Sequence, residues 1–348
     1  MRKHLKFILL ILIAVSIFWF FGRDLDLNLV AQSLGKAKAV YIISAVLIIC
    51  AGYLLRAKRW QVLLEPITET SLKELFATTA VGFTAVFLIG RAGEIVRPMW
   101  LPMRDKRVRP SAALVTLGIE RVFDLASLIC FFSLNLLWFE APAGREKELA
   151  YIKTVGYILL GGTFAGILAL YVYQRVSPGV ISRVERVTSH KFIPDKIARI
   201  IVSIFKQLAK SLEILRDWRE IVSVTFWTVL LWLAIALPTW LVLLAFDLPL
   251  DFSDALFIVG WAAIGSVVPT PGGAAGAFHA ATAGGLIFMN VAQEQAAAVS
   301  IAMHLVYFAP AVIFGLYYFV HGDISYSRFK NLLSSDLTVD PADSASGR

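Results

Sequence analysis

A group of three charged residues interrupts an apolar stretch of this chain near residue 90. Arg91, Glu94 and Arg97 recur every three residues, so on a helix they form one stripe, and Pro98 follows them directly. The guanidinium of arginine is a planar fork that donates paired hydrogen bonds to a phosphate or a carboxylate. The pattern therefore favours recognition of an anionic group.

A second charged group, Glu120, Arg121 and Asp124, lies within the apolar stretch from Ala112 to Phe139. Glu120 stands ten residues beyond Pro110, which is about 15 Å along a helix and near the middle of a membrane. Each charge left facing lipid would cost roughly 2.5–3.5 kcal/mol. These side chains are therefore expected to face protein or water and to pair with the first group.

Pairing of the two groups would set three arginines against three carboxylates, which gives the local neutrality that a site of low dielectric constant demands. Two interpretations follow. The ion pairs could be permanent and lock the packing of the helices. Alternatively, one or more arginines could be available to an anion such as a lipid phosphate.

A turn rich in proline and glycine interrupts another apolar stretch, Ala255 to Asn290. Pro269 and Pro271 remove backbone donors and stop the incoming helix. Gly272 and Gly273 let the backbone turn and approach its neighbours closely. The helix that follows would begin with free N–H groups and a positive dipole end, which can hold an anion.

Two histidines accompany this turn, His279 just after it and His304 in the last apolar stretch. Each suits a hydrogen-bonded histidine in the core, and a proton relay is the alternative. The two cysteines, Cys50 and Cys130, have neither the spacing of a zinc site nor that of a disulfide framework. We therefore expect no metal, no cofactor and no catalytic residue.

The three motifs together resemble the membrane region of the lysylphosphatidylglycerol synthases, a flippase-like family that includes the uncharacterised protein family 0104 type. The matching residues are Arg91-Ala-Gly-Glu94-x-x-Arg97-Pro98, Glu120-Arg121-x-x-Asp124 and Pro269-x-Pro-Gly-Gly273, and the resemblance covers roughly Phe7 to Val320. It implies a lipid flippase or a protein that handles a polyprenyl-linked lipid or glycolipid. Many members carry a glutamate shortly after the Gly-Gly turn, where this chain has one extra residue and His279, which could replace it. The resemblance implies no aminoacyl transferase activity.

The elements that position these residues must be membrane helices. The chain has 348 residues, of which 58% are hydrophobic, and a mean hydropathy of +0.72, values typical of an integral membrane protein. Its net charge of +8 comes from short loops between apolar runs, the positive-inside pattern, which argues against nucleic-acid binding. The basic N-terminus precedes an apolar run that lacks a small-residue cleavage site, so we expect an uncleaved first span.

Six stretches are expected to cross the membrane fully: Phe7–Phe21, Val40–Leu55, Ala112–Phe139, Tyr151–Tyr173, Ile221–Phe246 and Ala296–Val320. The stretches Phe76–Pro98 and Ala255–Asn290 are expected to be re-entrant hairpins, entering from the cytoplasmic and the outer side respectively. A single crossing followed by a basic external loop is the alternative for the first. The fold class is thus an all-α polytopic bundle of eight to ten membrane segments.

The order of span, hairpin and span occurs twice in opposite orientation, which predicts an inverted repeat with a substrate site near the midplane. Residues 1–325 form one membrane domain, and residues 326–348 are a polar tail expected to be disordered. Residues 194–220 are expected to form a cytoplasmic amphipathic helix, either on the membrane surface or against the ends of the bundle. Both termini should be cytoplasmic, in the plasma or inner membrane.

These features predict a transporter that moves an anionic phospholipid, or a polyprenyl-linked lipid or glycolipid, without ATP, because no phosphate-binding G-x-x-x-x-G-K-[ST] loop exists. The expected partners are membrane lipids with an anionic headgroup, with a homo-oligomer or a lipid-synthesis protein as further possibilities. A membrane-embedded transferase acting on a lipid-linked substrate is one alternative. A non-transporting partner of a lipid-synthesis complex is another.

Overall fold

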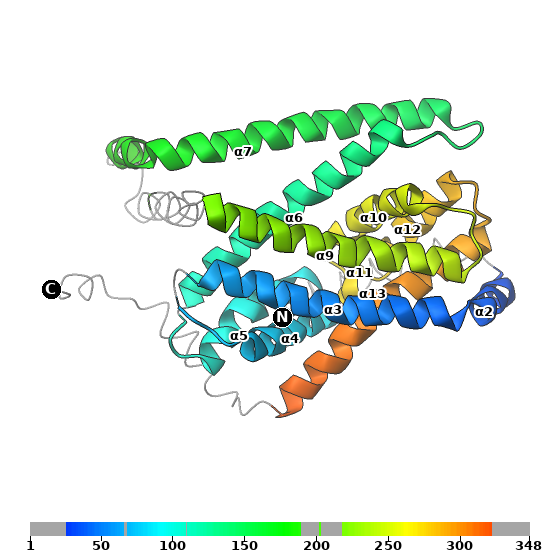
Figure 1. Ribbon diagram of the computed structural model, residues 1–348, viewed down its shortest axis with the longest axis horizontal. Coiled ribbons are helices and arrows are strands. Elements are labelled where there is room, and N and C mark those ends of the chain that lie inside the picture. The colour runs from blue at the N-terminus through cyan, green and yellow to red at the C-terminus, as the bar shows by residue number, and fades with distance from the viewer. Residues whose placement is uncertain (1–25, 66–67, 109, 189–201, 203–217, 322–348) are drawn as a thin grey trace, which may run out of the picture.

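A computed structural model describes residues 26–65, 68–108, 110–188, 202 and 218–321, and within these ranges the chain forms helices joined by loops (Figure 1). The predicted span at residues 7–21, the tail after residue 325 and most of the predicted amphipathic helix lie outside them. The elements are α2 (Leu27–Lys36), α3 (Ala39–Leu64), α4 (Leu72–Ile89), η1 (Gly90–Ile95), α5 (Val96–Arg104), α6 (Pro110–Trp138), α7 (Glu146–Thr188), α9 (Trp218–Ala245), α10 (Phe252–Val267), α11 (Pro271–Ala274), α12 (Ala277–Phe288) and α13 (Gln293–His321).

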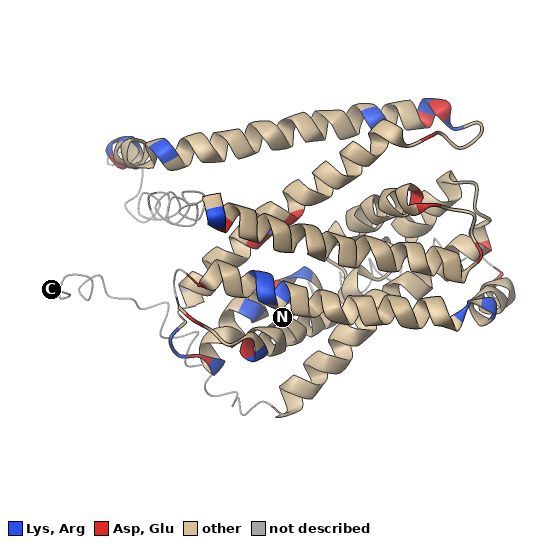
Figure 2. Cartoon of the chain, viewed as in Figure 1, with Lys and Arg blue, Asp and Glu red and all other residues tan. Residues whose placement is uncertain are grey.

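Five helical stretches of the described chain are long and apolar enough to cross a membrane, which confirms an all-helical polytopic membrane protein. They are Ala39–Leu64, Leu72–Arg104, Glu146–Thr188, Trp218–Ala245 and Gln293–His321. The second of them overlaps the stretch predicted as the first hairpin. α6, which carries the second charged group, is 29 residues long, and Figure 2 shows that charged residues occur along α3 and α6 as well as at helix ends.

The stretch Leu72–Arg104, called here the first hairpin, folds back on itself instead of running straight. α4 ends at Gly90, whose positive φ of 69° turns the chain into the 3-10 helix η1. A Cβ placed on Gly93 would lie 2.3 Å from the backbone of α4, so only glycine permits this close return. Arg104 at the end of α5 forms an ion pair with Glu74 in the first turn of α4. α4 and α5 are therefore antiparallel, with both ends of the hairpin at one side.

The stretch Phe252–Phe288, the second hairpin, has the same form. A capping box of Asp251 and Asp254 begins α10. α12 returns along α10 so closely that a Cβ on Gly265 would lie 2.6 Å from the carbonyl oxygen of Ala277. At the opposite end of the hairpin the rings of Phe257 and Phe288 have centroids 5.3 Å apart. α10 and α12 are therefore antiparallel along their whole length.

The two hairpins are held by neighbouring long helices. α3 packs along α9, α4 packs against α13, and α10 packs against both α9 and α6. α7 packs against α6 and runs along one edge of the molecule (Figure 1). Each hairpin thus lies between helices from both halves of the chain.

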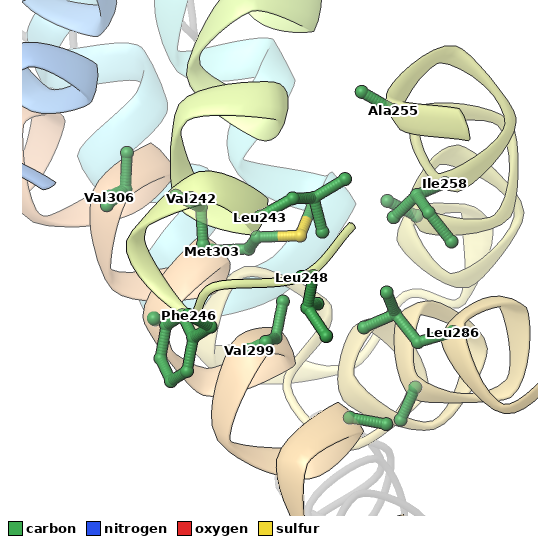
Figure 3. Packing of buried hydrophobic residues seen from close by; sticks show 14 of the residues in the cluster. Val242, Leu243, Phe246, Leu248, Ala255, Ile258, Leu286, Val299, Met303 and Val306 are labelled. Atoms are coloured by element: carbon green, nitrogen blue, oxygen red, sulfur yellow. The ribbon is translucent and has the colours of Figure 1, made fainter. Parts of the chain in front are cut away.

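Two apolar cores stabilise this arrangement. The larger joins α9, the second hairpin and α13, and Figure 3 shows Leu243, Met303 and Ile258 converging there. The smaller surrounds Trp60, which is fully buried, and joins the end of α3 to the first hairpin and α6. Close van der Waals packing in these two cores holds both hairpins to their neighbours away from the tips.

Candidate functional site

A cavity of about 670 Å³ lies beside the tips of the two hairpins. Five charged side chains line it: Arg56, Arg91, Glu94, Arg121 and Asp124. Apolar side chains from α6, α9, α10, α12 and α13 form much of the remaining lining, among them Leu125, Leu128, Trp232, Phe278 and Phe308. The cavity therefore presents both charged and apolar side chains to a ligand.

The hairpin tips touch each other at this cavity. Gly90, where α4 ends, lies so close to the turn of the second hairpin that a Cβ would be 3.1 Å from the carbonyl oxygens of Pro269 and Thr270. The Nε and Nη2 atoms of Arg91 donate hydrogen bonds of 3.2 and 3.0 Å to the backbone carbonyl of Ser266. The first hairpin is thus bonded to the second through a side chain that also lines the cavity.

Four charged groups form a network that extends from Asp124 in the cavity lining into the interior of the protein. Arg59 in α3 lies 3.3 Å from Glu120 and 2.5 Å from Asp124, both in α6. The second carboxylate oxygen of Glu120 accepts a 2.7 Å hydrogen bond from Arg97 in α5, whose guanidinium carbon lies 4.3 Å from the centroid of the Trp60 ring. Arg59, Arg97 and Glu120 are each at most 3% exposed. A buried charge is tolerated only when paired in this way.

The network continues to the cavity surface through more exposed groups. Arg121 lies 3.5 Å from Asp124 and 4.0 Å from Glu94. Glu94 in turn lies 3.3 Å from Arg91. Ion pairs therefore connect the buried end of the network at Arg97 to Arg91 at the hairpin tip.

The structure corrects the predicted balance of charges. The sequence pattern set three arginines against three carboxylates, but Arg59 joins the network and Arg56 lines the same cavity. The site thus contains five arginines and three carboxylates and is positively charged. The predicted span ended at Leu55, one residue before Arg56, whereas α3 continues to Leu64 and carries both residues. The three-residue spacing of Arg56 and Arg59 was the signal that both lie on one helix.

The turn between α10 and α12 has a left-handed backbone. Gly272, Gly273 and Ala274 have φ angles of 76°, 66° and 63° in succession. This conformation is accessible to glycine and strained for alanine. A Cβ on Gly273 would also lie 2.7 Å from the ring of Phe308. The two glycines of the motif therefore permit the turn, and Ala274 carries strain beside the cavity.

Two histidines support this turn from behind. Nε2 of His304 lies 3.3 Å from the carbonyl oxygen of Gly273, and the backbone N–H of Gly276 donates a 3.2 Å hydrogen bond to Nδ1 of His279. The ring centroids of His279 and His304 are 4.7 Å apart, and each residue is 7% exposed. The pair is thus built into the structure of the turn.

The structure brings the predicted site residues into one region but gives them different positions. Those that line the cavity are Arg91, Glu94, Arg121, Asp124 and Gly273. Those outside its lining are Arg97 and Glu120 in the buried network, Pro269, Pro271 and Gly272 in the turn, and His279 behind it. Their binding of a ligand stays a prediction. Within the described ranges, no group of three or more histidine, cysteine, aspartate or glutamate residues could hold a metal ion.

Comparison with known proteins agrees with these motifs. Residues 7–315 match the family described as lysylphosphatidylglycerol synthase TM region. A UPF0104 membrane protein of Pyrococcus horikoshii, PH1989, is 21% identical over 319 residues, which cover 87% of this chain and 91% of that protein. The matched family residues include both charged groups, both hairpins and the left-handed turn. The chain therefore belongs to the family of the lysylphosphatidylglycerol synthase transmembrane region.

Proposed function

We propose that this protein moves an anionic lipid across the membrane without ATP. The observation that carries the proposal is the cavity of about 670 Å³, which combines an arginine-rich region with an apolar wall. An anionic phospholipid, or a polyprenyl-linked or sugar-bearing lipid phosphate, has the same division between a charged headgroup and apolar tails. Arginine suits the headgroup because its guanidinium donates two parallel hydrogen bonds to one phosphate.

The cavity also offers a way for the tails to remain in the bilayer. Leu125 of α6 and Val267 of α10 line the cavity and are 59% and 63% exposed, so the lining reaches the outer surface of the bundle beside them. An acyl chain between these helices would replace lipid contacts with apolar protein contacts. Only the headgroup would then leave the interface, which avoids burying the tails within the bundle.

The two hairpins are the elements that we propose to be re-entrant, the first from the cytoplasmic side and the second from the outer side. In support, helices at corresponding positions in the two halves of the chain make corresponding contacts. α3 contacts α4 as α9 contacts α10, and α4 contacts α13 as α10 contacts α6. This relation is the one an inverted repeat would give, with the binding site between the two repeats.

The contact between the hairpin tips would then be the gate. A headgroup that passes from one side to the other must separate Gly90 from the turn at Pro269 and break the hydrogen bonds from Arg91 to Ser266. A bound anion would offer Arg91 an alternative acceptor, which lowers the cost of opening. Movement would be downhill or driven by an ion gradient, in a cell membrane with both termini cytoplasmic.

Reconstitution into vesicles tests the proposal. Purified protein is inserted into vesicles that carry a fluorescent anionic phospholipid or its zwitterionic counterpart, and dithionite bleaching reports the fraction of label that reaches the outer leaflet. We expect the anionic lipid to move faster in vesicles that contain the protein than in protein-free vesicles. We also expect it to move faster than the zwitterionic lipid in vesicles that contain the protein. Movement at the protein-free rate contradicts the proposal, and so does chemical conversion of the lipid, detected by mass spectrometry, in place of movement.

A further inference from the structure

We propose that Arg56 is the residue that holds the phosphate of the lipid in the cavity. This inference rests on the proposed function, because it names the headgroup chemistry that the same cavity would select. Arg56 lies in α3, one helical turn before Arg59, and was not among the residues that the sequence motifs singled out. It lines the cavity and is partly buried.

The surroundings of Arg56 fix its guanidinium without neutralising it. Its Cζ atom lies 4.9 Å from the centroid of the Phe83 ring, a cation–π contact that holds the group over the face of an aromatic side chain. Tyr53, one turn earlier in α3, also lines the cavity, but its hydroxyl donates to the backbone carbonyl of Tyr307. Neither neighbour supplies an acceptor to the guanidinium.

The other arginines that line the cavity already have carboxylate partners. Arg91 donates to Glu94 and to the carbonyl of Ser266, and Arg121 pairs with Asp124 and Glu94. Among the described residues, no hydrogen bond or ion pair holds Arg56. A partly buried cation of this kind is stabilised by an anion that reaches it through the cavity.

Asp124, which lines the same cavity, is already paired with other arginines. One oxygen of Asp124 lies 2.5 Å from Arg59, and the other lies 3.5 Å from Arg121. With five arginines and three carboxylates, the site has an excess of positive charge that an incoming phosphate would neutralise. Among the arginines that line the cavity, Arg56 is the one that no carboxylate of the described residues pairs with.

The chemistry of the cavity favours a phosphate carried by a lipid over a free phosphate ion. The apolar side chains of the lining include Leu128, Trp232 and Phe278. These side chains stabilise acyl chains and contribute nothing to a small hydrated anion. The ligand class is therefore a lipid phosphate, with the phosphate on Arg56 and the tails between α6 and α10.

A matched set of variants and lipids tests this assignment by native mass spectrometry of the full-length protein in detergent. The variants are Arg56→Gln, Arg56→Lys and the control Lys58→Gln. Lys58 lies two residues further along α3, bonds to Gln61 and does not line the cavity, so its replacement removes the same charge elsewhere. The lipid probes are phosphatidic acid and diacylglycerol of identical tails, which differ only in the phosphate, and glycerol 3-phosphate is the soluble competitor.

We expect wild type and Lys58→Gln to bind phosphatidic acid more tightly than diacylglycerol. Arg56→Gln should lose this preference, with an affinity for phosphatidic acid reduced by about tenfold or more, the scale of lost charge-assisted hydrogen bonds. Arg56→Lys should retain part of the affinity, because it keeps the charge and loses the paired donors. This second variant keeps the test decisive if Arg56→Gln fails to elute as a single species.

Two results would overturn the assignment. The first is unchanged binding of phosphatidic acid by Arg56→Gln, or an equal loss in Lys58→Gln. The second is competition by glycerol 3-phosphate at the concentration at which phosphatidic acid binds, which would show that the apolar wall does not contribute.

The same proteins distinguish failure of this inference from failure of the proposed function. If wild type moves no lipid in vesicles but binds phosphatidic acid through Arg56, the site stands and the transport proposal falls. If wild type moves anionic lipid and Arg56→Gln moves it at the same rate and with the same preference, transport stands and Arg56 is not its phosphate ligand.

Discussion

The guanidinium of Arg91 donates two hydrogen bonds to the backbone carbonyl oxygen of Ser266, 175 residues away in the sequence. This single acceptor lies near the end of α10, so the bond joins the tip of the first hairpin to the second hairpin. Because the acceptor is backbone, the contact depends on the identity of residue 91 and not on that of residue 266. A substitution at residue 91 therefore tests the contact, and a substitution at residue 266 serves as its control.

Replacing Arg91 by alanine should weaken discrimination between lipids. The variant loses a cavity cation and the bond that closes the hairpin tips, so the ratio of anionic to zwitterionic transport should fall by about tenfold. Ser266→Ala should transport like wild type, because its carbonyl remains. The vesicle bleaching assay measures both, and an unaltered ratio in Arg91→Ala would reject the role of Arg91 at the tip.

Replacing Arg97 should affect stability as well as transport, because its side chain is buried. Alanine at this position leaves Glu120 with Arg59 as its remaining strong cationic partner and opens space beside Trp60. Removing one member of a buried ion pair costs about 3–5 kcal/mol. We expect Arg97→Ala to lower the thermal unfolding midpoint in detergent, together with any loss of transport.

The contrary result for Arg97 is equally specific. An Arg97→Ala protein as stable as wild type, yet unable to move lipid, would assign Arg97 to ligand binding, as the spacing of Arg91, Glu94 and Arg97 suggests. Arg97→Lys separates charge from packing, since lysine keeps the cation but loses the planar contact with the indole.

The left-handed turn predicts opposite effects for two adjacent substitutions. Gly273→Ala places a Cβ 2.7 Å from Phe308 at a φ of 66°, which should destabilise the protein by about 1–3 kcal/mol. Ala274→Gly removes a Cβ from a residue with a φ of 63° and should be neutral or stabilising by up to about 1 kcal/mol. Thermal unfolding in detergent checks both, and equal destabilisation by the two would contradict the strained turn.

Much of the site could be predicted from the sequence because charged side chains within a membrane must face protein or water and not lipid. Glu94, Arg121 and Asp124 had to find partners away from lipid, and the structure gathers them around one cavity. The contact of the Pro-Gly-Gly turn with the other hairpin follows from the same restriction on irregular backbone. What the pattern alone did not show is which charges face the cavity and which lie behind it.

Arg56 and Arg59 were missed for a physical reason. Basic residues at the end of an apolar run ordinarily mark the cytoplasmic loop, and nothing local distinguishes a paired arginine from an exposed one. The partners of Arg59, Glu120 and Asp124, lie 61 and 65 residues away along the chain. Only the packing of α3 against α6 and α9 reveals that the helix continues past these charges.

Helix boundaries were likewise predicted correctly where local sequence sets them and incorrectly where it does not. The predicted span Ala112–Phe139 matches α6, Pro110–Trp138, because Pro110 and the apolar run define it locally. The predicted span Tyr151–Tyr173 is shorter than α7, which continues to Thr188 through Pro178. Hydropathy locates only the apolar run, whereas a helix can continue past the end of that run.

We propose that the two hairpins enter the membrane from opposite faces and meet at the cavity. The ends of each hairpin are exposed, so single cysteines introduced there report which side of the membrane they face. The positions are Lys73 and Lys106 for the first hairpin and Pro249 and Gln293 for the second. The background is a variant in which the two native cysteines are replaced by serine.

Labelling these four cysteines with a membrane-impermeant maleimide, on intact cells and on inverted vesicles, is the most direct test. We predict that positions 73 and 106 react only from the cytoplasmic side and positions 249 and 293 only from the outer side. Reaction of either pair from opposite sides would mean that its hairpin crosses the membrane as a single span, which contradicts the claim.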